Sequence, residues 1–284
     1  MIDIFMKIKK NNNFSQNEET IAQYILQHPD HVLNMNVKQF ANACYVSQAS
    51  IYRFCEKLEL SGYSELKVKI SSSIDNYMKS EKFDFDFPVK KYQTHYEIAG
   101  KIKEDYEKTV ASSFNLLSLD QLKKATHAMK KAKYIDVYAT AGNVYFAENF
   151  KFQMKEIGIE ISVPIDEYQQ RLSAASSDKT HLAIVISFGG RGINVQSIMG
   201  MLKDNGVPIL LISSYDYVPE VEVQYQLYIS PYENHYNKIS SFSTRLSILY
   251  VLDVLYTCYF ELDYEKNIEK KLEYYETLRR FKKK

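Results

Sequence analysis

The sequence predicts two domains of different class: an all-α N-terminal domain, and an α/β C-terminal domain with a parallel five-stranded sheet flanked by helices. Three observations predict this organisation. Short apolar runs at helical spacing, opened by capping signatures, fill residues 1–78. Residues 79–94 lose that period and contain Pro88, which indicates a linker, and their Phe-Asp alternation leaves an edge strand as the alternative. In residues 95–284, continuous apolar runs alternate with amphipathic stretches, the pattern of βαβ units.

The N-terminal domain is expected to be a set of short helices. Capping signatures open three of them, at the pairs Ser15–Glu18 and Asn36–Gln39 and at Ser47. The first helix is expected to stop at His28-Pro29, because a proline cannot continue a helix that precedes it. A fourth helix is expected from Glu65 to Tyr77.

The C-terminal domain begins with two expected helices, about 95–117 and from Ser118 to near Lys133. Buried strands are then predicted at Tyr134–Thr140, Ile159–Val163, His181–Ser187, Pro208–Ile212 and Gln226–Ile229. Amphipathic helices are predicted at about 144–157, 167–176 and 194–205, and a long one at Ile239–Leu262. A charged helix is expected to close the chain.

Two of the N-terminal helices are joined by only three to four residues, and the second is capped by Ser47 and carries polar side chains outward. This arrangement is typical of a helix-turn-helix, whose second helix enters the DNA major groove. Gln48 can pair with adenine, and Arg53 can reach guanine or a phosphate. The candidates for DNA contact are Ser47, Gln48, Ser50, Tyr52, Arg53, Lys57, Tyr63 and Lys67.

Spacing alone leaves an alternative open, a three-helix bundle whose polar face is only solvated. The charges of residues 1–78 do not decide between the two, because Lys and Arg there balance Asp and Glu. A DNA-binding domain needs a local basic patch, not a basic chain, so the position of each charge decides the question.

The segment VKQFANACYVSQASIYRFCEKLELSGYSELKVKI resembles the N-terminal domain of the RpiR family of sugar-responsive transcriptional regulators. The similarity covers most of residues 15–75 and includes loops as well as apolar positions, and it implies DNA binding. The family usually has glycine in the turn where this chain has Tyr45. A left-handed turn costs a bulky residue on the order of 1 kcal/mol, so a slightly different turn geometry is expected.

Ligands of open α/β sheets bind beyond the carboxyl ends of the strands. Two predicted strand ends run into glycine-containing loops, at residues 138–143 and 186–193. Glycines let backbone N–H groups approach an anion, and the helix that follows favours negative charge. Ordinary strand-to-helix turns also contain glycine and stay an alternative. The candidates for ligand binding are Thr140, Gly142, Asn143, Ser187, Gly189, Gly190, Arg191 and Gly192.

Residues from about 100 to 265 are similar to the sugar isomerase (SIS) domain, a phosphosugar-binding fold that RpiR regulators carry behind their DNA-binding domain. The similarity rests on ISFGGRG, VPILLIS and SSFSTRLSILYVLDVLY. Three phosphate-binding hydroxyls of that family are replaced here by Asn143, Gly189 and Gly192. Each lost hydroxyl removes a hydrogen bond worth roughly 1.5–3 kcal/mol, which Thr140 and Arg191 could offset. Otherwise the site binds another metabolite, or the domain only dimerises.

An enzyme is the main competing class, in the form of an SIS-type phosphosugar isomerase with an N-terminal appendage. Isomerisation needs an acid and a base, for which Glu233 and His235 are the nearest candidates. A recognition helix has no role in such an enzyme, so we expect a protein that is not an enzyme. With no nucleophile-elbow motif, Walker loop or metal-ligand cluster in the sequence, no metal or cofactor is expected.

The sequence thus predicts a cytoplasmic regulator of sugar metabolism genes. The three cysteines are odd in number and suit reduced thiols, and neither a membrane span nor a signal peptide is evident. The expected partners are double-stranded operator DNA, a small anionic sugar-type effector, and further copies in a homodimer or homotetramer built through the SIS domains. The effector would act on paired helix-turn-helix units through the 79–94 linker. In a second alternative the SIS domain only dimerises, and no metabolite affects DNA binding.

Overall fold

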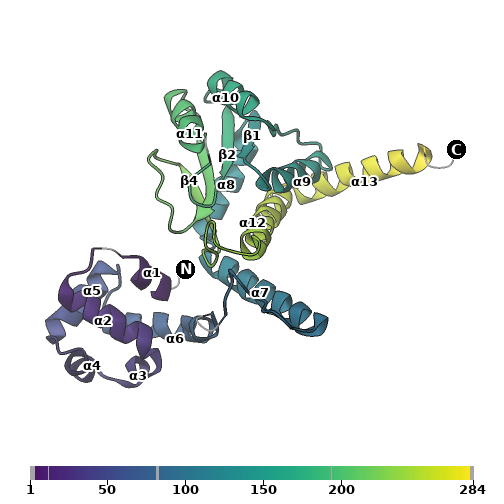
Figure 1. The fold of residues 1–284 in the computed structure, drawn as a ribbon. Helices are drawn as coiled ribbons and strands as arrows, with labels where there is room; N and C mark the ends of the chain where they lie inside the picture. The colour runs from purple at the N-terminus through teal and green to yellow at the C-terminus, as the bar shows by residue number, and fades with distance from the viewer. Residues whose placement is uncertain (1–3, 12, 81–82, 193, 282–284) are drawn as a thin grey trace. The chain divides into compact units, whose positions relative to one another are not determined.

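A computed structural model describes residues 4–11, 13–80, 83–192 and 194–281 (Figure 1). The chain forms two compact units, Met1–Asp84 and Phe85–Lys284. Residues 81–82, which fall within the expected 79–94 linker, lie outside the described residues.

The described part of the first unit consists of helices and the turns between them, as predicted. The helices are α1 (Ile4–Lys10), α2 (Gln16–Gln27), α3 (Pro29–Asn34), α4 (Val37–Ala43), α5 (Gln48–Lys57) and α6 (Tyr63–Ser80). Their apolar faces share one core, in which Phe40, Phe54 and Leu66 are fully buried. The capping signatures begin the helices where the sequence places them. For example, the side chain of Asn36 accepts a hydrogen bond from the backbone N–H of Gln39 at 2.9 Å.

Two short helices, α1 and α3, are absent from the sequence-based expectation. Pro29 ends α2 as predicted, but it also occupies the first position of α3. A proline is well tolerated there, because the N–H that it lacks has no partner in the first turn of a helix. In α1, Ile4 and Ile8 lie one turn apart and are both buried in the core of the unit.

The turn between α4 and α5 has the left-handed residue that a helix-turn-helix uses, although that residue is Tyr45. Its φ is +54°, and its side chain is 96% exposed. The N–H of Tyr45 donates to Asn42 O at 3.1 Å and that of Val46 donates to Ala41 O at 2.9 Å, the two bonds of a Schellman motif. The backbone therefore adopts the standard turn, and Tyr45 carries the strain of about 1–2 kcal/mol that a glycine would avoid.

The second unit is built on a parallel sheet with strand order β1-β2-β3-β4 among the described residues. The strands are β1 (Tyr134–Ala139), β2 (His181–Ile186), β3 (Ile209–Ser214) and β4 (Tyr225–Ile229). All neighbours pair in parallel, so the carboxyl ends of the strands lie along one edge of the sheet.

The expected fifth strand at Ile159–Val163 is wrong, because this segment forms only one isolated bridge, between Ser162 and Asp136 of β1. The N–H of Ser162 donates to Ile135 O at 2.9 Å, and Val137 N–H donates to Ser162 O at 2.8 Å. The next donor in such a ladder would be residue 164, which is a proline and has no N–H. The segment therefore contributes Ile161 and Val163 to the core without extending the sheet.

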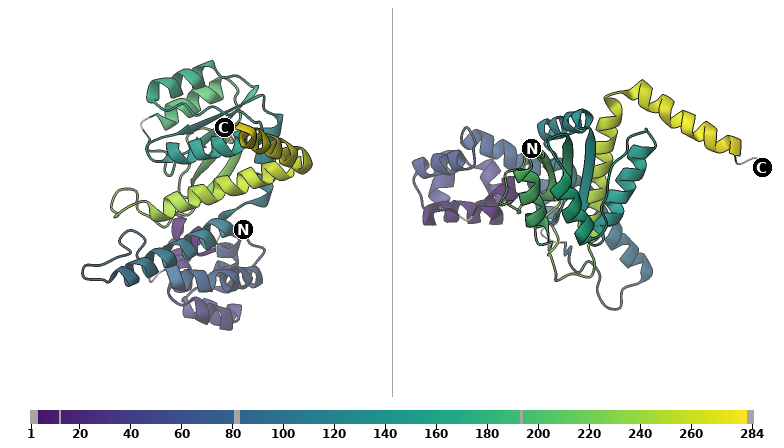
Figure 2. Two further views of the ribbon diagram at one scale, coloured as in Figure 1. Left: turned by 90° about the vertical axis from the view of Figure 1, so that its right-hand side faces the viewer. Right: turned by 90° about the horizontal axis from the view of Figure 1, so that it is seen from above.

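Helices cover both faces of the sheet, as Figures 1 and 2 show. One face packs against α8 (Leu119–Lys131), α9 (Asn143–Lys155) and α12 (Phe242–Glu261), and the other against α10 (Glu167–Ser176) and α11 (Val195–Asp204). Helix α7 (His95–Leu116) packs on α12, and α13 (Tyr264–Phe281) follows α12 at the end of the chain. The four predicted helices between and after the strands are thus confirmed to within three residues at each boundary. In the described part of the chain no helix is long and apolar enough to span a membrane.

Residues 85–94, expected as part of a linker, belong to the second unit. Phe85 is buried and stacks on Tyr232 with ring centroids 4.3 Å apart. Asp86 accepts hydrogen bonds from the backbone N–H groups of Asn234, at 2.6 Å to its carboxylate, and Ile239, at 2.9 Å to its carbonyl. The second unit is therefore held together from its first residues, Phe85 and Asp86, onward.

Candidate DNA-contacting face and ligand pocket

Helix α5 presents a polar outer face because its apolar side chains point into the core. Ile51, Phe54 and Cys55 are buried, and Gln48, Tyr52 and Arg53 are left exposed. The helix begins at Ser47, whose hydroxyl accepts from Ser50 N–H at 3.1 Å. Four of the eight residues predicted to contact DNA therefore lie exposed together at the start of α5: Ser47, Gln48, Tyr52 and Arg53.

The other four candidates use their polar groups inside the first unit. Ser50 is buried and shares a hydrogen bond of 2.9 Å with Ser47. Lys57 forms an ion pair of 2.8 Å with Glu18. Tyr63 is buried, which raises its pKa to about 12, and donates to the carbonyls of Val32 and Met35. Lys67 also donates to Met35 O, at 3.2 Å. Tyr63 and Lys67 therefore both donate to carbonyls at the end of α3. A DNA contact by any of these four residues stays a prediction.

A pocket of about 320 Å³ lies at the carboxyl edge of the parallel sheet in the second unit. Seven of the eight residues predicted to bind ligand line it: Thr140, Gly142, Asn143, Ser187, Gly189, Arg191 and Gly192. The eighth, Gly190, does not. The structure thus brings the two glycine-containing loops together around one cavity, and whether they bind a ligand stays a prediction.

Two positions of the second loop, 190 and 192, require glycine for different structural reasons. Gly190 has φ +67°, and a Cβ added there would lie 2.1 Å from the ring of Tyr217. The hydroxyl of Tyr217 is held by Gln196, which donates to it at 2.6 Å. At Gly192 an added Cβ would lie 2.8 Å from Val195 and 3.3 Å from the hydroxyl of Thr140. Both positions therefore need glycine for close packing of the loop.

Further lining residues come from the segment between β4 and α12 and from the first turn of α12, which sequence reasoning did not assign to ligand binding. The segment contributes His235, Lys238 and Ser241, and α12 contributes Thr244 and Arg245. Because this segment follows a strand at the same sheet edge as the glycine loops, its position could have been expected. The segment contains no glycine that would mark it as a ligand-binding loop, and the placement of its side chains depends on how α12 packs.

The lining of the pocket is rich in cationic side chains. Arg191, Lys238 and Arg245 line it, and no acidic side chain does among the described residues, although Glu233 behind the wall pairs with Lys238 at 3.0 Å. Burial and the charges of Arg191 and Lys238 lower the pKa of His235 below its ordinary value, so the imidazole is neutral at pH 7. Such a cavity favours an anionic ligand, because arginine and lysine form charge-assisted hydrogen bonds with phosphate and carboxylate oxygens.

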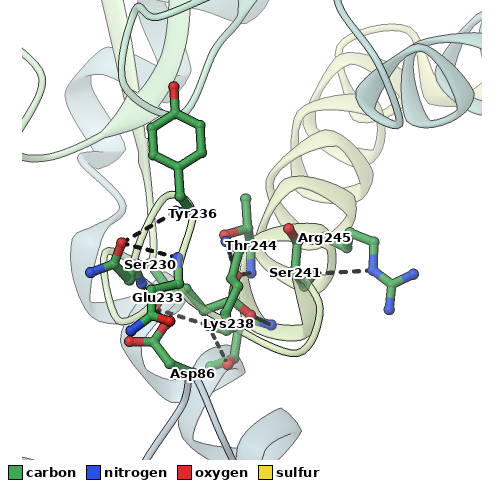
Figure 3. Close-up of polar contacts among 12 residues, drawn as sticks. Asp86, Ser230, Glu233, Tyr236, Lys238, Ser241, Thr244 and Arg245 are labelled. Atoms are coloured by element: carbon green, nitrogen blue, oxygen red, sulfur yellow. Dashed lines mark hydrogen bonds and ion pairs between the residues drawn. The ribbon is translucent and has the colours of Figure 1, made fainter.

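Glu233 anchors the segment that forms this wall, as Figure 3 shows. Its buried carboxylate accepts from the N–H groups of Ser243 at 2.6 Å and Thr244 at 3.2 Å, in the first turn of α12. It also accepts from the Thr244 hydroxyl at 2.6 Å and pairs with Lys238 at 3.0 Å. A carboxylate with these four partners is a helix cap, and it does not line the pocket.

Comparisons with known proteins match both parts of the chain. Residues 3–77 match the model of the helix-turn-helix domain of the rpiR family, and residues 128–258 match that of the SIS domain. An uncharacterized HTH-type transcriptional regulator of Caldanaerobacter subterraneus subsp. tengcongensis is 27% identical over 258 residues, 90% of each chain. The HTH-type transcriptional regulator HexR of Pseudomonas aeruginosa is 23% identical over 196 residues, 68% of this chain and 66% of HexR.

Solved structures share the fold. The Vibrio vulnificus NanR protein, solved in complex with ManNAc-6P, aligns with a TM-score of 0.59 and 16% identity over 98% of both chains. The sugar isomerase domain of an RpiR transcription factor from Sphaerobacter thermophilus aligns with a TM-score of 0.56 and 13% identity. That alignment covers 62% of this chain and 97% of the other.

Proposed function

The chain belongs to the RpiR family of helix-turn-helix transcriptional regulators with an SIS domain and is not an enzyme, and from this premise we propose what it senses. We propose that it regulates sugar metabolism genes and that a phosphosugar or related anionic metabolite, bound in the SIS domain, modulates its binding to operator DNA. The observation that carries the proposal is the pocket at the sheet edge, with three cationic side chains and no acidic one among its described lining residues.

The chemistry of the pocket supports a phosphorylated ligand despite the missing hydroxyls. Ser187 is the retained hydroxyl of the second loop, and it accepts from the Gly190 N–H at 3.1 Å, which leaves its proton for a ligand oxygen. Arg191 and Arg245 supply formal charge in place of the lost neutral donors. The NanR protein, similar in fold, was solved with ManNAc-6P, which supports a sugar phosphate as the first class of ligand to test.

In the first unit, the start of α5 is the proposed surface for DNA contact. Gln48 and Arg53 are exposed and of the types that read adenine and guanine edges, and Tyr52 lies between them. Ser47, at the N-terminus of the helix, suits a phosphate oxygen. Two such helices, one from each copy of a dimer, would bind a palindromic operator.

Thermal unfolding tests the proposed ligand. A ligand that binds only the native state raises the melting temperature by mass action, so phosphosugars and amino-sugar phosphates are expected to raise it and their unphosphorylated counterparts are not. Arg191→Ala should weaken the binding roughly 10- to 100-fold, because it removes hydrogen bonds to a charged group. Arg171→Ala, an exposed arginine of α10, is the matched control.

Absence of any shift with millimolar phosphosugars would contradict the proposed ligand class. It would leave two outcomes, a sensor of some other metabolite or an SIS domain that only dimerises. A shift that Arg191→Ala and Arg171→Ala reduce equally would instead place the ligand outside this pocket.

The segment that forms the pocket wall also contacts the chain just after the first unit, and this supports a route for the effector signal. On one side it lines the pocket with His235 and Lys238. On the other side its backbone N–H groups at Asn234 and Ile239 donate hydrogen bonds to Asp86, which Figure 3 labels. Its Tyr232 stacks on Phe85. A ligand that binds one arrangement of this segment more tightly would change how residues 85–86 are held.

Asp86→Ala is expected to uncouple ligand binding from DNA binding. The variant loses the hydrogen bond from Asn234 but no pocket residue, so the affinity for the ligand should stay within about threefold of wild type. The ligand changes operator affinity by a factor that is commonly 5- to 150-fold in allosteric proteins. In the variant the logarithm of this factor should fall to half of the wild-type value or less. Both affinities are measured by titration calorimetry and fluorescence anisotropy. Asp204→Ala, an exposed aspartate of α11, should keep the full ligand response. If Asp86→Ala also keeps it, the route is wrong.

A further inference from the structure

Asp105 is a buried aspartate of α7 whose carboxyl group has one hydrogen-bond partner among the described residues. None of its surface is exposed, and it lies on the face of α7 that packs against α12. Its Oδ1 lies 3.2 Å from the Thr109 hydroxyl, whereas its Oδ2 has no partner in the described part of the chain. Burial removes the water that would stabilise an ionised carboxylate, and a single hydroxyl does not replace that water. The surroundings of Asp105 therefore favour the neutral carboxylic acid.

The hydroxyl of Thr109 connects this carboxyl group to α12. It lies 3.2 Å from Asp105 Oδ1 and 2.8 Å from Ser243 Oγ, but it has only one proton to donate. If that proton goes to Ser243, the shorter contact, the bond between Asp105 and Thr109 needs the proton of a neutral carboxyl group. The hydrogen bonds then run in one direction, from Asp105 to Thr109 to Ser243, and the Ser243 hydroxyl donates on to Ser230 at 3.5 Å. An ionised carboxylate would instead compete with Ser243 for the Thr109 proton.

Ser243 lies in the first turn of α12, which also forms part of the pocket. The N–H of Ser243 donates to the Glu233 carboxylate at 2.6 Å, and the next residue, Thr244, lines the pocket. Figure 3 labels Glu233 and Thr244 at this turn. Ser243 is therefore held twice, by Glu233 through its backbone and by Thr109 through its side chain. The hydrogen bonds that begin at Asp105 thus connect α7 to the position of a pocket residue.

Two charged groups act on Asp105 in opposite directions. Burial raises the pKa of Asp105 from its ordinary value of 3.8 to about 6, and the negative charge of Glu233 contributes to the rise. The bond to Thr109 and the positive charge of Lys108 offset only part of it. An ionised Asp105 therefore adds a second negative charge near the carboxylate that holds the start of α12.

The lysines near Asp105 pair with other carboxylates. On α7 itself, Lys101 and Lys108 both pair with Glu104, at 2.9 and 2.8 Å. On the segment after β4, Lys238 pairs with Glu233 at 3.0 Å. The side chains of α12 that bond α7 are serine hydroxyls, and β4 contains no aspartate, glutamate, histidine, lysine or arginine. Each of these three lysines thus has an acidic partner other than Asp105.

We propose that Asp105 is a positioning residue of the ligand pocket, which keeps a proton in the folded protein and holds the first turn of α12 through Thr109 and Ser243. Loss of the proton breaks the one-way series of hydrogen bonds and adds negative charge near Glu233. Both effects disfavour the arrangement of Thr244 in the pocket and the binding of an anion there. The positioning role rests on the proposed ligand pocket, whereas the protonation of Asp105 does not.

Urea unfolding of the full-length protein at pH 5 and pH 8 tests the proton without ligand or DNA, so its failure leaves the proposed function untouched. Because the pKa of Asp105 is higher in the folded protein than in the unfolded chain, its stabilising contribution is lost as the pH rises through about 6. Asp105 alone should therefore raise the unfolding equilibrium constant about tenfold between pH 5 and pH 8.

Asp105→Asn isolates this contribution, because the amide stays neutral and can still donate to Thr109. Other groups, such as His235, titrate in both proteins and cancel in the comparison. The variant should match wild type within about twofold at pH 5 and should have an unfolding equilibrium constant about tenfold lower at pH 8. Asp120→Asn, at an exposed, ion-paired aspartate of α8, should keep the wild-type pH profile. An Asp105→Asn variant that is less stable than wild type at both pH values would overturn the proposal.

Carbon-13 NMR of the aspartate carboxyl groups gives a second measurement on the wild-type protein, which holds even if the variant folds poorly. One aspartate signal should titrate with a midpoint near pH 6, and Asp105→Asn should remove it. Absence of any aspartate signal with a midpoint above about pH 5 would show that Asp105 is ionised in the folded protein.

Sulfate binding, measured by titration calorimetry, tests the positioning role. Sulfate keeps its charge between pH 5 and pH 8, unlike a sugar phosphate, whose second pKa is about 6. At pH 8 Asp105→Asn should bind sulfate roughly threefold or more tightly than wild type, because it lacks the carboxylate charge near Glu233. At pH 5 the two proteins should bind it alike. An Asp105→Asn variant that binds sulfate no more tightly than wild type at pH 8 would overturn the positioning role and leave the proposed phosphosugar ligand untouched.

Discussion

Glu233→Ala is expected to lower the free energy of unfolding of the second unit by about 3–5 kcal/mol, the usual result of removing one partner of a buried ion pair. The side chain of Glu233 is fully buried, and that of Lys238 is only 10% exposed. Without the carboxylate, the ammonium of Lys238 and two backbone N–H groups at the start of α12 lose their acceptor. Urea unfolding followed by circular dichroism measures the change.

Two controls make this result specific to the cap. Glu233→Gln keeps the shape and one acceptor oxygen and should lose less stability than Glu233→Ala. Glu276→Ala removes an exposed glutamate of α13 and should change stability by no more than about 0.5 kcal/mol. A loss below 1 kcal/mol for Glu233→Ala would mean that the carboxylate does not hold the segment between β4 and α12. The outcome also bears on the isomerase alternative, since a catalytic base faces its substrate and is not committed to a helix N-terminus.

Arg53→Ala should weaken operator binding roughly 10- to 100-fold, with fold and oligomeric state unchanged. Arg53 is exposed, and the hydrogen bond that it donates to the Ser50 hydroxyl is long, at 3.5 Å, so the guanidinium is available to a base or phosphate. The measurement is fluorescence anisotropy on a DNA site selected from random sequence by the wild-type protein.

Lys57→Ala on the same helix is the comparison for Arg53→Ala. The ammonium of Lys57 is bound to the carboxylate of Glu18 and to Asn13 O, so its loss should cost at most a few-fold in operator affinity. If Arg53→Ala retains full affinity, α5 does not read DNA through this residue. If Lys57→Ala has the larger effect, the ion pair with Glu18 opens on binding.

The sequence predicts most of the helices and strands because local signals decide them. Caps such as Ser47 and Asn36, and apolar runs such as those of β2 and β3, act over a few residues. The fifth strand fails for an equally local reason, since Pro164 cannot supply the next hydrogen bond of the ladder. The turn at Tyr45 shows the opposite case. A residue unsuited to the left-handed region still adopts it, because packing of α4 and α5 into one core outweighs about 1–2 kcal/mol.

The site is predicted only in part. Glycine-containing loops at strand ends are visible in the sequence, and they locate one wall of the pocket. The other wall depends on the anchoring of Lys238 and Thr244 by Glu233, a tertiary arrangement with no motif. On α5 the pattern identifies the outer face, but it cannot tell that Lys57 turns back to Glu18. The sequence pattern alone therefore cannot tell which candidates for DNA contact are exposed and which, like Lys57, are bonded to residues distant in sequence.

The attachment of Phe85 and Asp86 also determines where the second unit can be separated from the rest of the chain. A fragment beginning at His95, the boundary that the sequence pattern indicates, lacks the ring that covers Tyr232 and the acceptors for Asn234 and Ile239. It also lacks Thr94, whose side chain caps α7. A fragment that begins ten residues earlier retains all of these contacts. Proteolysis of the native protein should therefore leave a stable core that begins at or before Phe85, so the excised second unit keeps residues 85–94, ten of the sixteen residues expected as a linker.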